Sequence, residues 1–137
     1  MPPPYKKAKE ISLTELASDV GLYPPEAFEF IQQGLSFTVQ KLHGPKATPK
    51  ASRHVTGQDL CEGLREYAVS QWGFLARTVL RRWNITGTID FGRIVFALVE
   101  VGQMQKTDDD TLDDFKDVYD FRVAFETGYR VTTTDAL

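Results

Sequence analysis

Residues 88–100 read TIDFGRIVFALVE, and this stretch has the strongest helical periodicity in the sequence. Its apolar side chains recur every three or four residues, a spacing that places them on one face of an α-helix. These side chains are Phe91, Ile94, Val95, Leu98 and Val99. Thr88 is predicted to cap the start of the helix and Gly102 to end it. The stretch therefore predicts a helix with one face in a hydrophobic core.

Two further helices are predicted just before it. Thr56 and Asp59 resemble a capping box, with Asp in place of the usual Glu or Gln, and open a helix that ends near Trp72 and Gly73. Another apolar pattern follows almost at once and stops near Asn84.

The first half of the chain predicts two helices. Ser12 can cap a short one that Gly21 ends. Pro25 begins the clearer one, because proline lacks the N–H group that would be unsatisfied at the first helical position. Its apolar stripe is Phe28, Ile31, Leu35, Val39 and Leu42, widened by Phe30 and Phe37. So wide a stripe predicts a helix buried on more than one side.

These elements predict a mainly α fold, with five or six helices around a single core in one domain spanning residues 11–125. After Gly102 the periodicity weakens, and residues 106–125 fit a helix, a short hairpin or an irregular strap. A hairpin would make the fold winged-helix-like; otherwise it is a purely all-α bundle. Residues 1–10, with three consecutive prolines, are expected to form a flexible arm, and residues 126–137 a frayed tail.

Composition and charge agree with one folded domain that ends in an acidic segment. The 137 residues are 42% hydrophobic and 26% charged, both ordinary for a globular protein. Residues 1–105 carry 12 basic and 10 acidic side chains, whereas residues 106–137 carry 4 basic and 9 acidic ones. Because disordered acidic tails are poor in aromatics, we expect the aromatics of residues 106–125 to pin this strap to the helices while its aspartates face water.

Three features bear on where the protein resides. The single cysteine, Cys61, excludes an intrachain disulfide and fits a reducing compartment. The lysines near the N-terminus precede no apolar run, so a signal peptide is not expected. The longest apolar run, residues 94–99, is far too short to span a bilayer. We therefore expect a cytoplasmic protein with no membrane partner.

Several short stretches of the chain carry a family resemblance. They are YPPEA (23–27), HVTGQDL (54–60) with GLREYA (63–68), and DFGRIVFALVE (90–100) with KT (106–107), DF (114–115) and YDF (119–121). Together they span most of residues 23–125 and resemble a family of conserved hypothetical proteins restricted to Planctomycetes and Verrucomicrobia. The resemblance implies a bacterial origin and a single domain. It implies no activity, and no functional residue can be transferred from it.

No catalytic, cofactor-binding or metal-binding residues are predicted. His43 and His54 flank a loop and could share a metal or a proton, but neither belongs to a known ligand pattern. With Cys61 they would still leave a tetrahedral zinc site one ligand short. Cys61 lies among apolar residues and is predicted to be a small buried hydrophobe. With no nucleophile–base pair or phosphate loop visible, an enzyme is not the favoured interpretation.

Seven aspartates lie between Asp108 and Asp120, and oxygen-rich clusters attract calcium or magnesium. The calcium-loop pattern fails here, because Leu112 occupies the fifth position and the required glycine is missing. A solvated turn is the favoured interpretation, with a weak cation site as the alternative.

The basic residues give the remaining candidates for phosphate or partner contacts. They are Lys46, Lys50 and Arg53 in the loop before residue 54, and Arg77, Arg81 and Arg82 on the helix that ends near Asn84. The favoured function is a non-enzymatic protein-interaction module with an unknown protein partner. The alternative is a nucleic-acid- or ribosome-associated protein that uses the basic face around Arg77, Arg81 and Arg82.

Overall fold

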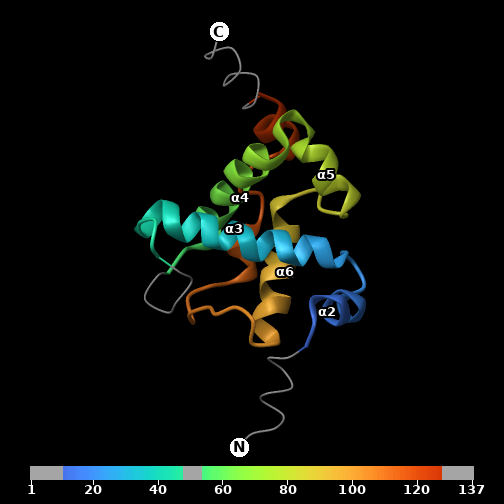
Figure 1. Ribbon diagram of the computed structural model, residues 1–137, viewed down its shortest axis with the longest axis vertical. Helices are drawn as coiled ribbons and strands as arrows, with labels where there is room; N and C mark the ends of the chain where they lie inside the picture. The colour runs from blue at the N-terminus through green and yellow to red at the C-terminus, as the bar shows by residue number, and fades with distance from the viewer. Residues whose placement is uncertain (1–10, 48–53, 128–137) are drawn as a thin grey trace, which may run out of the picture.

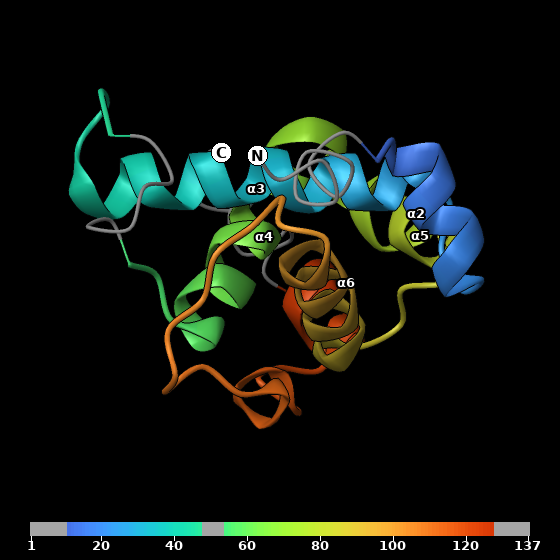
Figure 2. The same ribbon diagram turned by 90° about the horizontal axis from the view of Figure 1, so that it is seen from below.

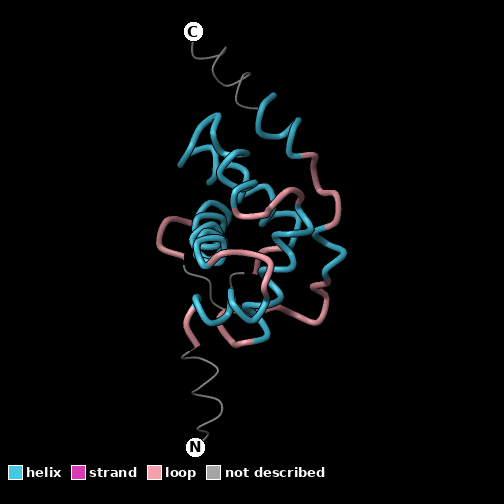
Figure 3. Tube along the Cα trace, turned by 90° about the vertical axis from the view of Figure 1, so that its right-hand side faces the viewer, coloured by secondary structure: helices cyan, strands magenta, loops and turns pink. Residues whose placement is uncertain are grey.

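The structure is a computed structural model that describes residues 11–47 and 54–127. Five α-helices form this part of the chain, and no strand occurs in it (Figures 1 and 3). They are α2 (Leu13–Val20), α3 (Pro25–His43), α4 (Gly57–Trp72), α5 (Ala76–Arg82) and α6 (Thr88–Glu100). The predicted mainly α fold is confirmed. The arm predicted at residues 1–10 lies outside the described residues, as does most of the predicted tail.

Local signals explain where the helices begin. Ser12 caps α2, its hydroxyl accepting a hydrogen bond from the Glu15 N–H at 3.0 Å. Pro25 opens α3 as predicted. The Thr56 hydroxyl accepts from the Asp59 N–H at 3.0 Å and caps α4, which ends at Trp72. These three predicted starts are confirmed.

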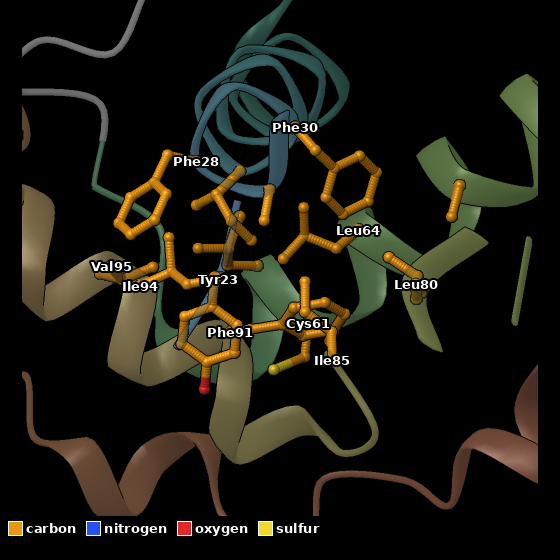
Figure 4. Packing of buried hydrophobic residues seen from close by; sticks show 14 of the residues in the cluster. Tyr23, Phe28, Phe30, Cys61, Leu64, Leu80, Ile85, Phe91, Ile94 and Val95 are labelled. Carbon is orange, nitrogen blue, oxygen red and sulfur yellow. The ribbon is translucent and has the colours of Figure 1, made fainter. Parts of the chain in front are cut away.

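The helices form layers around one core. In Figure 2, α3 lies across one side of α4 and α6, and the orange segment after α6 lies on their other side. Helix α3 packs against α2, α4 and α6. The core includes residues of the predicted apolar stripes, and those that are buried are Phe28, Ile31, Phe91, Ile94, Val95 and Leu98. Leu64 of α4 is buried with them, and Figure 4 shows how it packs with Phe28 and Phe91 in the cluster. Leu35, also on a predicted stripe, is only partly buried.

Glycines let α3 and α4 approach closely. A Cβ atom on Gly34 would lie 2.2 Å from a Leu64 methyl carbon, and one on Gly63 would lie 1.8 Å from the Thr38 hydroxyl oxygen. The Thr38 hydroxyl turns back and donates to the Gly34 carbonyl at 2.7 Å. Each glycine thus leaves room for a side chain of the other helix, and neither can be replaced without moving that side chain.

Asp90 is the buried carboxylate of the described core and joins the start of α6 to the loop before α3. Its Oδ1 atom accepts from the Tyr23 hydroxyl at 2.5 Å and from Arg93 at 3.0 Å. Its Oδ2 atom accepts from the backbone N–H groups of Thr86 at 2.9 Å and Gly87 at 3.2 Å. Burial, together with the Asp90 hydrogen bond, raises the pKa of Tyr23 to about 12. The Asp90 carboxylate therefore finds the hydrogen-bond donors that a buried charge needs within the fold.

Thr88 does not cap α6 as predicted; Gly87 is the N-cap residue. The Thr88 side chain is buried instead, where it donates to the Phe115 carbonyl at 2.6 Å and accepts from the Val118 N–H at 3.0 Å. The capping role falls to Asp90, whose carboxylate reaches back to the Thr86 and Gly87 amides. Thr88 is the first residue of α6, and its hydroxyl holds the segment after α6.

Residues 106–125 form an irregular strap, one of the three alternatives left open by the sequence. It contains the 3₁₀-helix η2 (Leu112–Phe115) and the start of the π-helix η3 (Arg122–Thr127). Its aromatic anchors are buried or partly buried, and most of its aspartates are exposed. The anchors are Phe115, Tyr119, Phe121 and Phe125.

The Phe115 side chain packs against glycines of two helices, α4 and α6. A Cβ atom on Gly92 of α6 would lie 2.7 Å from Phe115 Cγ, and one on Gly57 of α4 would lie 3.1 Å from its ring. The ring is 4% exposed. The strap is therefore held by shape complementarity against bare backbone as well as by apolar burial.

We predict that Gly92→Ala lowers the free energy of unfolding by about 1–3 kcal/mol, the usual cost of overpacking. At an ordinary helix position the same change stabilises by about 1 kcal/mol, so the sign is diagnostic. Chemical denaturation monitored by circular dichroism would measure it. A variant more stable than the wild type would mean that Phe115 does not pack on Gly92.

Candidate functional site

The basic residues that the structure describes, candidates for phosphate or partner contacts, lie in two separate parts of the fold. Lys46 is exposed in the loop after α3, whereas Arg77, Arg81 and Arg82 lie on α5. In both Figures 1 and 2 that loop and α5 lie at opposite ends of α3. Arg81 and Arg82 are exposed, and Arg77 is partly buried with contacts of its own. Lys50 and Arg53 lie outside the described residues.

The two histidines are brought close together, but not as a metal site. The His43 Nε2 atom lies 3.1 Å from the His54 carbonyl oxygen, and His54 Nε2 lies 3.4 Å from an Asp110 carboxylate oxygen. Among the residues that the structure describes, no three His, Cys, Asp or Glu side chains gather so as to hold a metal ion. These contacts tie the end of α3 to the start of α4 and to the strap.

The aspartates of the strap form local turns. Asp110 accepts from the Thr107 N–H at 2.8 Å, Asp114 from the Thr111 N–H at 2.9 Å, and Asp120 from the Arg122 N–H at 2.9 Å. Each closes a short turn by the local hydrogen bonding typical of Asp. The carboxylates therefore stabilise backbone turns along the strap.

An aromatic cleft lies between α3, α4 and the end of α5, and its floor is Phe30. The Phe30 ring lies 5.6 Å from Tyr67, 5.4 Å from Trp72 and 5.9 Å from Trp83, measured between ring centroids. Phe30 is only 2% exposed, while the other three rings are partly exposed. Trp72 and Trp83 are nearly perpendicular, at 82°, with centroids 5.4 Å apart. The cleft thus has a rigid floor and accessible aromatic walls.

Backbone geometry brings the two tryptophans together. Gly73 has a φ of 55°, a left-handed conformation that favours glycine, and it ends α4 directly after Trp72. The 3₁₀-helix η1 (Gly73–Leu75) then leads into α5. Asn84, which follows Trp83 after the end of α5, has a φ of 65°. Its side-chain amide donates to the Leu22 carbonyl at 3.1 Å. Trp83 is therefore held next to the start of α3.

The rim of the cleft is polar and acidic. Glu26, Glu29 and Gln33 contribute from α3, and Gln71 contributes from α4. The Tyr67 hydroxyl donates to Gln33 Oε1 at 2.9 Å, and Gln33 Nε2 donates to Glu29 Oε1 at 3.0 Å. Within the described ranges, the recorded ion pairs involve other acids and leave Glu26 and Glu29 without a cationic partner. The cleft therefore presents two negative charges beside aromatic rings.

This arrangement suits the binding of a cation. Aromatic faces attract cations within about 6 Å of the ring centre, and tryptophan does so best. The cleft volume is about 190 Å³, below the roughly 300–1,000 Å³ of pockets for drug-sized ligands. One side chain fits this volume better than a metabolite. The described residues that line the cleft carry carboxylates, amides and aromatic rings, and none of them is Ser, Cys, His or Lys.

A second cleft, of about 310 Å³, lies between the start of α6 and the strap. Its lining includes Thr86, Gly87, Asp117 and Asp120. The Thr86 and Gly87 amides that point to the start of the helix already donate to Asp90. Because these two amides already donate to Asp90, they are not available to a ligand, and the aromatic cleft is the stronger candidate site.

Sequence reasoning did not identify the aromatic cleft. The sequence predicts Phe30 on the wide apolar stripe of the helix that Pro25 begins and Trp72 near the end of a later helix, and neither pattern predicts the cleft. Two tryptophans beside helix termini in an otherwise ordinary composition were the available signal. Their approach depends on the Gly73 turn, which the periodic pattern does not reveal.

No family model, curated protein or solved structure matches this chain. The resemblance to the bacterial family of conserved hypothetical proteins therefore stays a prediction. No helix in the described ranges is both long and apolar enough to cross a membrane.

Cys61 is a buried thiol, as predicted, and burial raises its pKa to about 12. Because the thiolate is the reactive form, we predict that Cys61 is inert to Ellman's reagent at pH 8 in the folded protein. It should react fully once guanidinium chloride unfolds the chain. Reaction at the rate of a free cysteine without denaturant would place Cys61 at the surface.

Proposed function

We propose that the protein is a non-enzymatic protein-interaction module whose binding site is the aromatic cleft. One observation carries the proposal: Glu26 and Glu29, which have no cationic partner among the described residues, lie beside the accessible rings of Tyr67, Trp72 and Trp83. A partner that inserts a positively charged side chain would satisfy both the charges and the rings. The proposal includes a cytoplasmic location and a bacterial origin, which rest on the sequence alone.

The surroundings of the cleft favour a polypeptide as the partner. Leu75, three positions after Trp72 in the sequence, is 50% exposed. Leu22, whose carbonyl accepts from the Asn84 side chain beside Trp83, is 51% exposed. Interfaces combine a few aromatic anchors with apolar neighbours and a polar rim. A segment with a basic residue flanked by apolar ones matches this arrangement.

Selection from a phage-displayed random peptide library on the immobilised protein would test this function. The two tryptophans are the only ones in the chain and both line the cleft, so their fluorescence reports binding there. We predict that synthetic versions of the selected peptides change this fluorescence and bind Glu26→Gln/Glu29→Gln at least about tenfold more weakly, a loss of about 1.4 kcal/mol.

The matched control is Asp108→Asn/Asp109→Asn, which removes the same two charges from an exposed part of the strap and should leave peptide affinity unchanged. Failure to select any peptide, or selection of peptides that bind the glutamate variant as tightly as the wild type, would contradict the proposed function.

The nucleic-acid alternative keeps one supporting observation, since Arg81 and Arg82 are exposed on α5. If they contact phosphate, Arg81→Gln/Arg82→Gln should weaken binding of a fluorescein-labelled RNA or DNA and flatten its dependence on salt concentration. Arg77 is left unchanged because it is partly buried. A wild-type protein that binds neither nucleic acid at low salt, where such contacts are strongest, would exclude this alternative.

A further inference from the structure

We propose that the group bound in the aromatic cleft is the guanidinium of an arginine side chain, held between the tryptophan walls and the carboxylates of Glu26 and Glu29. This inference rests on the proposed function and specifies its ligand.

The hydrogen bonds at the rim run in one direction and leave acceptors open. The Tyr67 hydroxyl donates to Gln33, and the Gln33 amide donates to Glu29. The donors of these two hydrogen bonds are therefore directed toward the Glu29 carboxylate. The last acceptor in this series is Glu29 Oε1, and the carboxylate oxygens of Glu26 and Glu29 have further lone pairs that can accept hydrogen bonds. The rim therefore calls for a ligand rich in donors. An anion is excluded by its charge.

A quaternary ammonium fits this rim poorly. Trimethyllysine or choline carries a positive charge but has no N–H group, so it cannot donate a hydrogen bond to the carboxylates of Glu26 and Glu29. Cages for such groups depend on aromatic faces, whereas here four polar side chains share the lining with four rings. Among cations, the chemistry of the rim selects one that donates.

Arginine fits better than lysine for two reasons. Glu26 and Glu29 are three residues apart on α3, so their side chains lie on the same face of the helix, where a planar fork with five N–H groups can reach both. The flat guanidinium can also stack on a partly exposed indole while its edge donates to the carboxylates, which a compact ammonium cannot do. The perpendicular walls of Trp72 and Trp83 allow one ring to stack with the group while the other covers its edge.

Titration of tryptophan fluorescence with capped amino acids would test this proposal directly. The probes are N-acetyl amides of arginine, lysine, trimethyllysine and citrulline, the last being a neutral analogue of arginine with nearly the same shape. We expect saturable binding of the arginine amide, and binding of the citrulline amide weaker by at least about tenfold, because charge-assisted hydrogen bonds are roughly twice as strong as neutral ones. The lysine and trimethyllysine amides should also bind more weakly than arginine.

Three variants complete the test. Glu26→Gln/Glu29→Gln should lose at least about tenfold in arginine affinity, whereas Asp108→Asn/Asp109→Asn should bind as the wild type does. Trp72→Phe, which keeps an apolar ring, should bind arginine more weakly with an unchanged circular dichroism spectrum, because phenylalanine attracts cations less than tryptophan.

Two kinds of result would overturn the arginine assignment. One is equal binding of citrulline, lysine or trimethyllysine; the other is no binding of the arginine amide. Selected peptides that bind at the cleft but contain no arginine would refute this inference while leaving the proposed function standing. Failure to select peptides at all would count against both.

Discussion

The ring of Phe30 is where α3, α4, α6 and the end of α5 meet. It leaves α3 and contacts Tyr67 and Trp72 of α4, Trp83 just after α5, and Phe91 of α6, with centroid separations from 5.4 to 6.4 Å. Phe30 and Phe28 point from α3 toward different parts of the core (Figure 4). Because the same ring fills the core and forms the floor of the cleft, the packing that stabilises the fold also sets the shape of the site. A site built this way needs little reorganisation to bind.

The acidic strap completes this packing from the other side of α4 and α6. Phe115 occupies the space left by Gly57 and Gly92, and Thr88 bonds to the strap backbone on both sides of Asp117. The centroid of the Phe121 ring lies 5.5 Å from that of Phe91, which in turn contacts Phe30. A continuous chain of aromatic contacts thus runs from the strap through the core to the cleft. Loss of the strap would loosen the floor on which the tryptophans pack.

Much of the fold follows from local sequence signals, and the site does not. Apolar periodicity and caps such as Ser12 and Thr56 act over a few residues, so helix positions could be predicted. The cleft depends on the positive φ angles of Gly73 and Asn84 and on the hydrogen bond from the Asn84 side chain to the Leu22 carbonyl, which is far away in the sequence. Thr88 shows the same limit, because its bonds to the strap span 27 and 30 residues. The sequence pattern also does not reveal that the loop after α3, which holds Lys46, and helix α5, which holds Arg81 and Arg82, lie at opposite ends of α3 (Figure 1).

The most direct test of arginine recognition at the aromatic cleft is a two-dimensional ¹H–¹⁵N NMR titration of the full chain with N-acetyl-arginine amide. The spectrum contains two indole signals, one from Trp72 and one from Trp83. Binding at the cleft predicts that both shift, together with the backbone amides of residues 26–33, while the amides of Gly87 and Asp117 at the second cleft stay fixed. Shifts confined to the second cleft, or unchanged indole signals at saturating arginine amide, would contradict it.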